Sequence, residues 1–291
     1  MNVQGFEHII RENELLSAHT WFRIGGPARY FAEPTNMDEL VGLVARCRHE
    51  EVPVRLIGGG SNVLVRDSGV EGVVIHLAAA PFAQIKIQDD AIVAGGAAKL
   101  HHLISVAVGE GLAGLETLVG IPGTVGGALH INAGTETADI GQHLASATVL
   151  TRNAQVLTRQ GDDLRFAYQQ SSLDELVILD ACFKLERGSP AELTRRMQKT
   201  WISKTAGQPS ATQNAGCIFK NPSGASAAAM IEEAGLRGSR VGDAEVSDRN
   251  ANFIITHPRC KADDVIRLIE LLRSGVEDRL GVKLESSIQI W

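Results

Sequence analysis

Two glycine-rich segments of this chain have the residue types and spacing of a phosphate-binding site. The first directly follows an apolar run that ends at Ile57, so a strand is expected to lead into a loop with almost no side chains. Successive residues without a Cβ atom can turn several N–H groups toward one anion, and short Ser and Asn side chains add hydrogen bonds. We therefore expect a phosphate to be held by Gly58, Gly59, Gly60, Ser61 and Asn62.

A second glycine-rich segment starts about 60 residues later, at Gly120. Two such segments suggest one extended ligand that carries phosphate, whereas for either segment alone a tight turn is the simpler alternative. The expected cofactor contacts in and after this segment are Gly120, Ile121, Pro122, Gly123, Thr124, Gly126, Gly127, Asn132 and Gly134.

The glycine pattern disfavours a dinucleotide-binding domain of the Rossmann type. The fingerprint G-x-G-x-x-G opens a helix, but Val63-Leu64-Val65 after the first loop is typical of another strand.

Composition limits the classes of protein to consider. The chain has 291 residues, 44% of them hydrophobic, which is enough for two or three compact units with a sizeable core. The net charge of −6 is spread along the chain, so we expect neither nucleic acid nor a membrane as partner. The sequence has no run of 18 apolar residues and no apolar segment typical of a signal peptide, which predicts a cytoplasmic protein.

Cysteine and histidine spacing predicts neither a metal site nor a disulfide framework. The four cysteines, Cys47, Cys182, Cys217 and Cys260, are far apart and form no C-x-x-C pair. The nine histidines include one adjacent pair, whose side chains would point about 100° apart on a helix, so we interpret them as surface residues.

Alternating helix and strand patterns indicate the elements that position the glycine loops. Asn36 followed by Glu39 resembles a capping box, which starts a helix that ends near Glu50, before the first loop. Later segments predict a hairpin over 84–88 and 91–95, a helix over 98–110, and strands over 145–150, 155–158 and 176–185.

The last third has a different organisation. The polar segment 188–213 marks the expected domain boundary, since it contains two Gly/Pro-rich stretches. After it we expect strands over 216–220 and 252–256, and helices over 226–235 and 262–280, the last ended by Gly281.

Taken together, these segments resemble the family of UDP-N-acetylenolpyruvoylglucosamine reductases, flavoenzymes that make UDP-N-acetylmuramate for peptidoglycan. The resemblance rests on Thr20-Trp21-Phe22-Arg23-Ile24-Gly25-Gly26, residues 58–65, Gly114-Leu115-Glu116, residues 120–127, Asn132-Ala133-Gly134, Gln208-Pro209, residues 215–222 and residues 234–238.

The resemblance implies an α+β protein with a vanillyl-alcohol-oxidase-type FAD-binding fold in two lobes and a C-terminal α+β substrate domain. We expect the lobes at 1–78 and 79–188 and the substrate domain at 189–291, in the shorter subtype of the family. The implied cofactors are noncovalent FAD and NADPH, the partner is a UDP-sugar substrate, and we expect a monomer.

In this family NADPH reduces the flavin, a hydride passes to C3 of the enolpyruvyl group, and C2 then takes a proton. The resemblance implies a serine or cysteine as proton donor, an arginine and a glutamate. Cys217 stands at the donor position. A thiol with a pKa of about 8.5 is a stronger acid than a serine hydroxyl and suits this role. A buried structural cysteine is the alternative.

The other two catalytic positions depart from the family. Where it has Tyr-Arg-x-Ser, this chain reads Tyr168-Gln169-Gln170-Ser171, so Gln169 replaces the arginine. Where it has a C-terminal glutamate, this chain reads Leu284-Glu285-Ser286-Ser287, so Ser287 replaces it. A lost charge-assisted contact, worth roughly 1.5–3 kcal/mol, predicts slow turnover. Glu285 can take the place of the family's glutamate only if the strand shifts by two residues. A slip in the alignment is the simpler explanation of why Ser287 falls on that position.

Further substrate contacts are expected from polar residues around these positions, since lysines suit a diphosphate. They are Tyr168, Lys204, Gln208, Lys220, Asn221 and Glu285.

Three functions stay open at this point. The first is the reductase itself. The second is a flavin- or UDP-sugar-binding relative with impaired catalysis, because two of the three catalytic positions are changed. The third is a flavin oxidoreductase of the same fold with another substrate.

Overall fold

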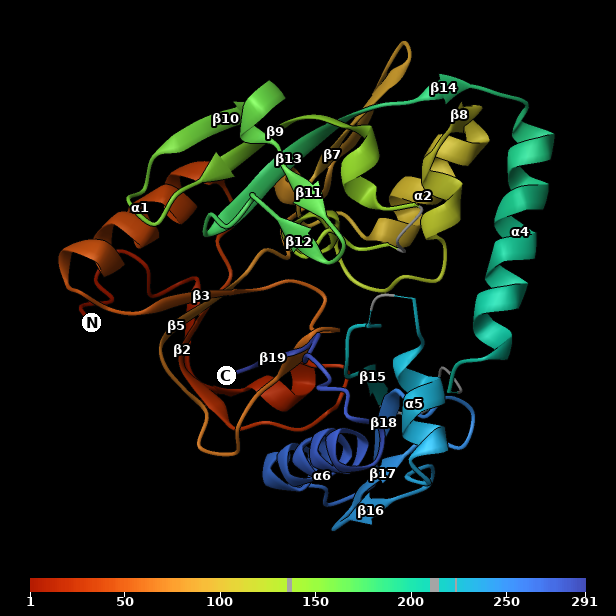
Figure 1. Cartoon of the computed structure of the whole chain (residues 1–291). Helices are drawn as coiled ribbons and strands as arrows, with labels where there is room; N and C mark the ends of the chain where they lie inside the picture. Colours follow the sequence, from red (N-terminus) through yellow and green to blue (C-terminus); the bar gives the residue numbers. More distant parts are fainter. Residues whose placement is uncertain (135–137, 210–214, 223) are drawn as a thin grey trace. The chain divides into compact units, whose positions relative to one another are not determined.

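The computed structural model describes residues 1–134, 138–209, 215–222 and 224–291 (Figure 1). It divides into two compact units. The first comprises residues 1–12, 29–59 and 71–204, and the second comprises residues 13–28, 60–70 and 205–291. Each unit is described separately below.

A four-stranded sheet, which lies mainly in the first unit, leads into the first glycine loop. Its strand order is β1 (Ile10–Leu15), β2 (Pro27–Ala32), β5 (Val70–His76) and β3 (Val54–Ile57), with β3 and β5 parallel. Helix α1 (Met37–His49) buries Leu40, Leu43, Val44 and Cys47 in the same core. The predicted capping box is half formed, because Asn36 accepts from the Glu39 N–H at 3.0 Å while the Glu39 carboxylate accepts from Thr35.

The second sheet of this unit is five-stranded and antiparallel, in the order β10-β9-β13-β7-β6. The strands are β6 (Ile85–Gln88), β7 (Ala91–Gly95), β9 (Leu144–Leu150), β10 (Val156–Gln160) and β13 (Val177–Lys184). The hairpin and strand predictions for these segments are confirmed. Helices α2 (Leu100–Gly109) and α3 (Val125–His130) pack into the core of this sheet. Helix α3 was not predicted, since Gly126-Gly127 reads as loop.

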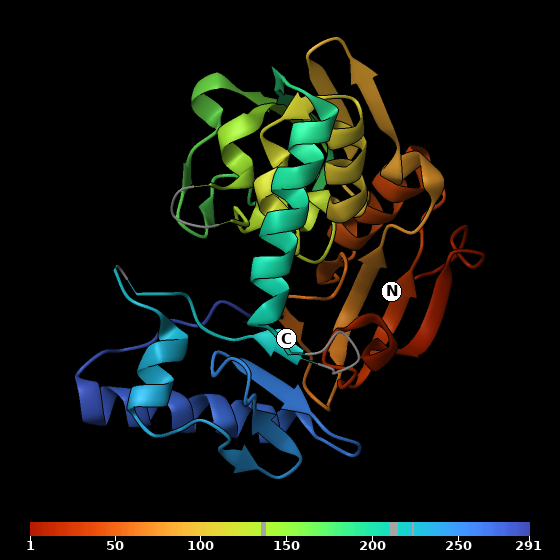
Figure 2. The same cartoon turned by 90° about the vertical axis from the view of Figure 1, so that its right-hand side faces the viewer.

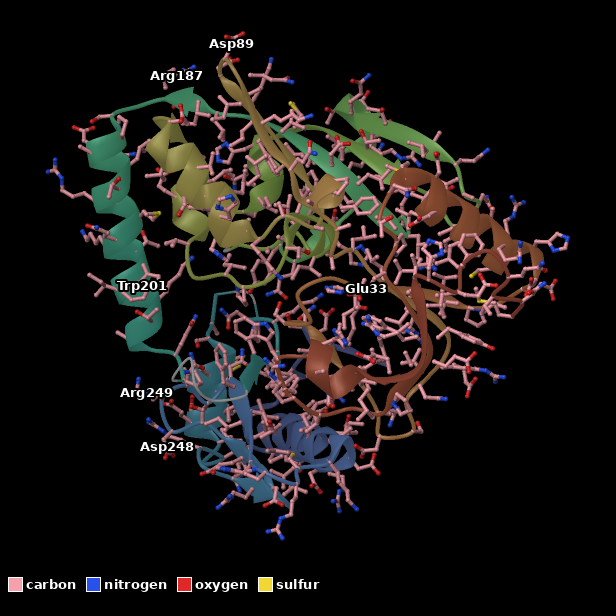
Figure 3. All side chains as sticks on the ribbon, turned by 180° about the vertical axis from the view of Figure 1, so that it is seen from behind. Glu33, Asp89, Arg187, Trp201, Asp248 and Arg249 are labelled. Atoms are coloured by element: carbon pink, nitrogen blue, oxygen red, sulfur yellow. The ribbon has the colours of Figure 1, made fainter. Side chains whose placement is uncertain are left out.

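Shorter elements complete the first unit. They are strands β8 (Leu112–Ala113), β11 (Phe166–Ala167), β12 (Gln170–Ser171) and β14 (Glu186–Arg187), and 3₁₀ helices at Ala80–Ala83, Leu115–Leu118, Ile140–His143 and Gly161–Asp163. Arg187 of β14 donates to the Asp89 carbonyl oxygen, and Figure 3 shows the two residues together at the tip of the β6–β7 hairpin.

The predicted boundary segment is largely helical. Helix α4 (Pro190–Ala206) has 17 residues, most of them polar. Leu193 is the one described residue that it fully buries. Figures 1 and 2 show the helix alongside α2. Most of it belongs to the first unit, and residues 210–213 of the predicted boundary lie outside the described residues.

The second unit is built on an antiparallel sheet in the order β15-β18-β17-β16. Its strands are β15 (Ala215–Cys217), β16 (Arg240–Val241), β17 (Ala244–Val246) and β18 (Phe253–Thr256), and its helices are α5 (Ala227–Glu233) and α6 (Ala262–Leu280). Helical spacing predicts one apolar stripe on helix α6, of which Val265, Ile269, Leu272 and Val276 are buried and Leu280 is half-buried. The helix ends at Gly281 as predicted, in the left-handed conformation (φ 68°) that glycine adopts without strain.

Two N-terminal segments, 13–28 and 60–70, pack with the C-terminal third. Phe22 is buried against Gly216, and its carbonyl oxygen accepts from Thr256 Oγ1 at 2.7 Å. Strand β4 (Val63–Leu64) pairs in parallel with β19 (Gln289–Ile290), and a 3₁₀ helix spans Leu16–His19. The expected division at 78 and 188 assigns both segments to the first lobe, and the three-domain division stays a prediction.

Candidate active site

The structure brings the two glycine loops of the first unit into direct backbone contact. A Cβ atom on Gly58 would lie 2.7 Å from Thr124 Oγ1, and one on Gly59 would lie 2.7 Å from Gly123 Cα. Real Cβ atoms do not approach other atoms so closely, so only glycine allows this contact. Two segments far apart in sequence therefore form one surface of backbone.

The second loop is held by backbone pairing with residues 96–100. Leu100 N–H donates to Gly123 O at 3.1 Å, and Gly126 N–H donates to Gly96 O at 2.8 Å. Thr124 caps helix α3, because its Oγ1 accepts from Gly127 N–H at 3.3 Å. The N–H groups of Gly126 and Gly127 are therefore used within the protein, and the expected cofactor contacts of these two residues stay a prediction.

Four backbone N–H groups at the contact between the loops have no hydrogen-bond acceptor among the described residues. Within the described parts of the chain, the N–H groups of Gly58, Gly59, Gly123 and Thr124 donate no hydrogen bond to the protein. Buried or crowded backbone donors are almost always satisfied, and clustered free N–H groups form anion-binding nests. These four positions are the backbone groups of the two loops that are open to an anionic ligand.

The rest of the first loop belongs to the second unit and has a structural role there. Gly60 has φ 66°, and a Cβ atom on it would lie 1.9 Å from His19 O. Asn62 donates through Nδ2 to Ser287 O at 3.0 Å, and its own carbonyl oxygen accepts from Gln289 N–H. Asn62, predicted as a cofactor contact, thus fixes the C-terminal segment.

Asn132 likewise supports the hairpin that carries Gln169. It is buried; its Nδ2 donates to Ala167 O at 2.8 Å and its Oδ1 accepts from Gly141 N–H at 3.1 Å. Strands β11 and β12 flank the two-residue turn Tyr168-Gln169, and Gln169 is half-buried with φ 50°. A positive φ is what a two-residue hairpin turn requires, so the turn itself accounts for this conformation.

Cys217 is the last residue of β15, where it pairs with Phe253 of β18. Desolvation of the sulfur raises the pKa of its thiol to about 11, and the Ile218 N–H lowers it slightly, while the residue keeps a solvent-exposed surface. Solvent access limits the shift, but any pKa above the ordinary value leaves the thiol protonated at neutral pH. A protonated thiol is the form that a proton donor requires.

The C-terminal segment lies directly beside the Cys217 strand. Ser287 N–H donates to Ile218 O at 2.7 Å, and Lys220 N–H donates to Glu285 O at 2.9 Å. The Lys220 Nζ also contacts Glu285 Oε1 at 2.5 Å. The second unit thus brings together four of the predicted site residues, namely Cys217, Lys220, Glu285 and Ser287.

Other predicted substrate contacts are placed differently. Asn221 accepts through Oδ1 from Ala227 N–H at 3.1 Å, at the start of α5. Lys204 belongs to the first unit, where its Nζ donates to Thr117 O at 2.8 Å and its side chain lies beside Gly120. Burial lowers the Lys204 pKa. It is therefore placed with the second glycine loop, and not in the unit that holds Lys220. Gln208 follows α4 in the second unit.

Sequence reasoning missed Asn252. This buried residue, just before β18, donates from Nδ2 to Phe219 O at 2.8 Å and contacts Cys217 Sγ at 3.4 Å. The available signal was a polar residue inside the apolar pattern Ala251-Asn252-Phe253-Ile254.

In the described ranges, all four cysteines are free and no three His, Cys, Asp or Glu side chains group in a way that suits a metal ion. None of the described helices is both long and apolar enough to cross a membrane.

Comparison with known proteins identifies the class. Residues 28–159 match the FAD binding domain family, and residues 208–291 match the family "UDP-N-acetylenolpyruvoylglucosamine reductase, C-terminal domain". The chain is thus an FAD-binding oxidoreductase of the vanillyl-alcohol-oxidase fold type with an added C-terminal α+β domain, which confirms the predicted fold class.

Full-length relatives define the family more narrowly. UDP-N-acetylenolpyruvoylglucosamine reductase from Rhodopirellula baltica is 39% identical over 98% of this chain and 93% of that protein. The Bradyrhizobium enzyme of the same name is 39% identical over 95% of this chain and 90% of its own length. The crystal structure of UDP-N-acetylenolpyruvylglucosamine reductase from Thermus caldophilus superposes with a TM-score of 0.82 at 35% identity, covering 97% of this chain and 99% of that one. The chain belongs to the UDP-N-acetylenolpyruvoylglucosamine reductase family.

Proposed function

We propose that this protein reduces UDP-N-acetylglucosamine enolpyruvate to UDP-N-acetylmuramate, with FAD as bound cofactor and NADPH as electron source, in peptidoglycan precursor synthesis. The observation that carries the proposal is the place of Cys217, which stands at the family's donor position, on β15, directly before Ile218, whose carbonyl oxygen accepts from the Ser287 N–H of the C-terminal segment. Family membership over nearly the full chain supports it.

The cofactor is held by backbone in this proposal. The N–H groups of Gly58, Gly59, Gly123 and Thr124 would bind FAD phosphates, without a covalent bond to the protein. FAD, when bound, supplies the hydride that reaches C3 of the enolpyruvyl group.

The chain's own residues then donate the proton and set the charge around the enolpyruvyl group. Cys217 donates its proton to C2 of the substrate, and a thiolate remains on the sulfur. Gln169 and Ser287 occupy positions where the family has a cation and an acid, and both are neutral. Lys220 is a candidate cation in the second unit, but its contact with Glu285 offsets the charge. We infer slower proton and hydride transfer than with a full set of charged residues.

Substrate contacts from Tyr168, Gln208, Lys220 and Asn221 are part of the proposal. Lysines bind a diphosphate as point charges. Lys220 keeps only a small exposed side-chain surface, 19%, so it acts at a partly desolvated position. The monomeric state and the cytoplasmic location stay predictions.

A second candidate is a binding protein with impaired catalysis. It is favoured by the two neutral replacements, Gln169 and Ser287, which leave the enolpyruvyl carboxylate without the family's cation. Flavin binding is expected in both cases and does not separate the two functions.

The test is substrate-dependent NADPH consumption by the purified yellow protein. We expect oxidation of NADPH when UDP-N-acetylglucosamine enolpyruvate is present, and one UDP-N-acetylmuramate formed for each NADPH consumed. UDP-N-acetylglucosamine, which lacks the enolpyruvyl group, is the control and is expected to leave the rate at background. NADPH oxidation without product would contradict the reductase function.

A further inference from the structure

Asn252 is bonded through every polar group that it carries. Its Oδ1 accepts from Phe219 N–H at 2.9 Å, and its Nδ2 donates to Phe219 O at 2.8 Å. Its backbone N–H donates to Asn250 Oδ1 at 3.0 Å, and its carbonyl oxygen accepts from Ile218 N–H at 3.0 Å. A buried amide satisfied in this way has one fixed orientation.

The remaining donor of this amide is directed at the Cys217 sulfur. A carboxamide NH₂ group has two hydrogens, and the second acceptor within reach of Nδ2 is Cys217 Sγ at 3.4 Å. Because this N–H occupies a lone pair of the sulfur, the S–H proton must point elsewhere. The Phe219 carbonyl oxygen lies 4.0 Å from the sulfur, at the limit for an S–H donor, and its stronger bond is the one it accepts from Asn252 Nδ2 at 2.8 Å.

We propose that Asn252 is a positioning residue for Cys217: its amide turns the thiol proton outward and stabilises the thiolate that forms when the proton is given up. The inference rests on the proposed donor role of Cys217. In that step the S–H bond breaks, a C–H bond forms at C2 of the substrate, and the electron pair stays on the sulfur until water returns a proton.

Charged groups near the thiol do not take over this role. After β15, Lys220 and Glu285 of the C-terminal segment neutralise each other at 2.5 Å. On the loop before Asn252, Asp248 and Arg249 are exposed and extend outward in Figure 3. A hydrogen bond to a charged acceptor is stronger than one to a neutral acceptor, so the Asn252 contact strengthens as the thiolate forms.

The decisive measurement is the alkylation rate of Cys217 by iodoacetamide at pH 8, resolved by peptide mass spectrometry on the FAD-loaded protein. Asn252→Ala is expected to lower the rate roughly tenfold to hundredfold, because less thiolate is present at a given pH. Cys182, half-buried in β13, serves as the reference thiol within each sample and is expected to keep its rate. Asn250→Ala is the matched variant, because it weakens the same loop without touching the sulfur.

Asn252→Asp is the second variant and decides the question if Asn252→Ala does not fold. It keeps an acceptor for Phe219 N–H but removes both N–H donors, and slow alkylation is expected again at pH 8 and at high salt, which screens the repulsion between the new carboxylate and the thiolate. An unchanged Cys217 rate in the folded Asn252 variant, or an equal loss in Asn250→Ala, would overturn the proposal.

Activity separates this inference from the proposed function. Asn252→Ala should slow turnover in the parent but add nothing in a Cys217→Ala background, since the two act on one proton. A Cys217→Ala protein with parental turnover would refute the donor role, while the alkylation result would still report whether Asn252 stabilises the thiolate.

Discussion

Asn62 fixes the register of Ser287: its Nδ2 donates to the Ser287 carbonyl oxygen at 3.0 Å, and the Ser287 N–H donates to Ile218 O at 2.7 Å. Glu285 is meanwhile engaged by Lys220 through both backbone and side chain. A two-residue shift that brought Glu285 to the position of Ser287 would break all of these bonds. In this structure Ser287, and not Glu285, therefore lies beside Asn62 and Ile218.

The first prediction concerns the proton donor. Cys217→Ala should lose nearly all turnover, whereas Cys217→Ser should keep a measurable part, because a hydroxyl retains a proton at the same place but is a weaker acid. Rapid-mixing absorbance of the flavin should show that reduction by NADPH is normal in both variants. An alanine variant with the parental turnover would remove Cys217 from the mechanism.

The second prediction restores the family's charges. The double variant Gln169→Arg/Ser287→Glu should speed transfer to the enolpyruvyl substrate by roughly tenfold or more, with non-additive single effects because both groups act on one carboxylate. Reduction by NADPH should not change. The two half-reactions are measured separately by stopped flow.

The matched control for Gln169→Arg is Gln170→Arg, which adds the same charge to the next residue of the hairpin, an exposed position of β12. An equal acceleration by Gln170→Arg would indicate a general effect of charge. A parent already as fast as typical members would show that other residues have replaced the two groups.

The third prediction tests the contact between the glycine loops. Gly59→Ala places a Cβ atom 2.7 Å from Gly123 Cα, so the loops must separate and FAD should bind at least about tenfold more weakly. Gly109→Ala is the control, because it lies in α2 with open space around the added atom. Titration of the cofactor-free protein with FAD compares the two. Equal FAD affinity of Gly59→Ala and the parent would contradict the assigned cradle.

The fourth prediction concerns pH. The backbone N–H of Thr35, 2.7 Å from Glu39 Oε2, is the main cause that lowers the Glu39 pKa to about 2, and His8 and the Thr35 hydroxyl add to it. A lowered folded-state pKa gives stability that is present above the ordinary pKa near 4.5 and is lost as the pH falls toward about 2. Carboxyl NMR titration should show this midpoint, and Glu39→Gln should unfold at lower denaturant concentration than the parent at pH 7 but not at pH 2. A Glu39 midpoint near 4.5 would contradict the assignment.

Local sequence signals predicted much of the fold. Burial of one helix face requires apolar residues at helical spacing, and the sequence has them at Leu40, Leu43, Val44 and Cys47 of α1 and along α6. Helix α4 has no such spacing, since Leu193 is its one fully buried residue in the described structure. The packing of residues 13–28 with the C-terminal third depends on long-range contacts, such as Thr256 with Phe22, that no local pattern encodes.

For the candidate site, the sequence indicated the glycine loops but not the roles of the buried polar residues. Glycine density indicated the loops at 58–59 and 123–124, because only glycine permits their contact. The sequence did not separate ligand-facing from structural polar residues: Asn62 and Asn132 bond to backbone oxygens of the protein. Asn252 was missed because a single buried amide has no spacing to recognise.

The most direct test of the central claim is an anaerobic single turnover. The FAD-loaded protein is reduced with one equivalent of NADPH, freed of nucleotide, and mixed with UDP-N-acetylglucosamine enolpyruvate, while flavin absorbance and product mass are followed. The reductase assignment predicts full return of the oxidised flavin absorbance with one UDP-N-acetylmuramate per flavin, slowly in the parent and faster in Gln169→Arg/Ser287→Glu. Flavin that stays reduced in the presence of bound substrate, in both the parent and that variant, would contradict it.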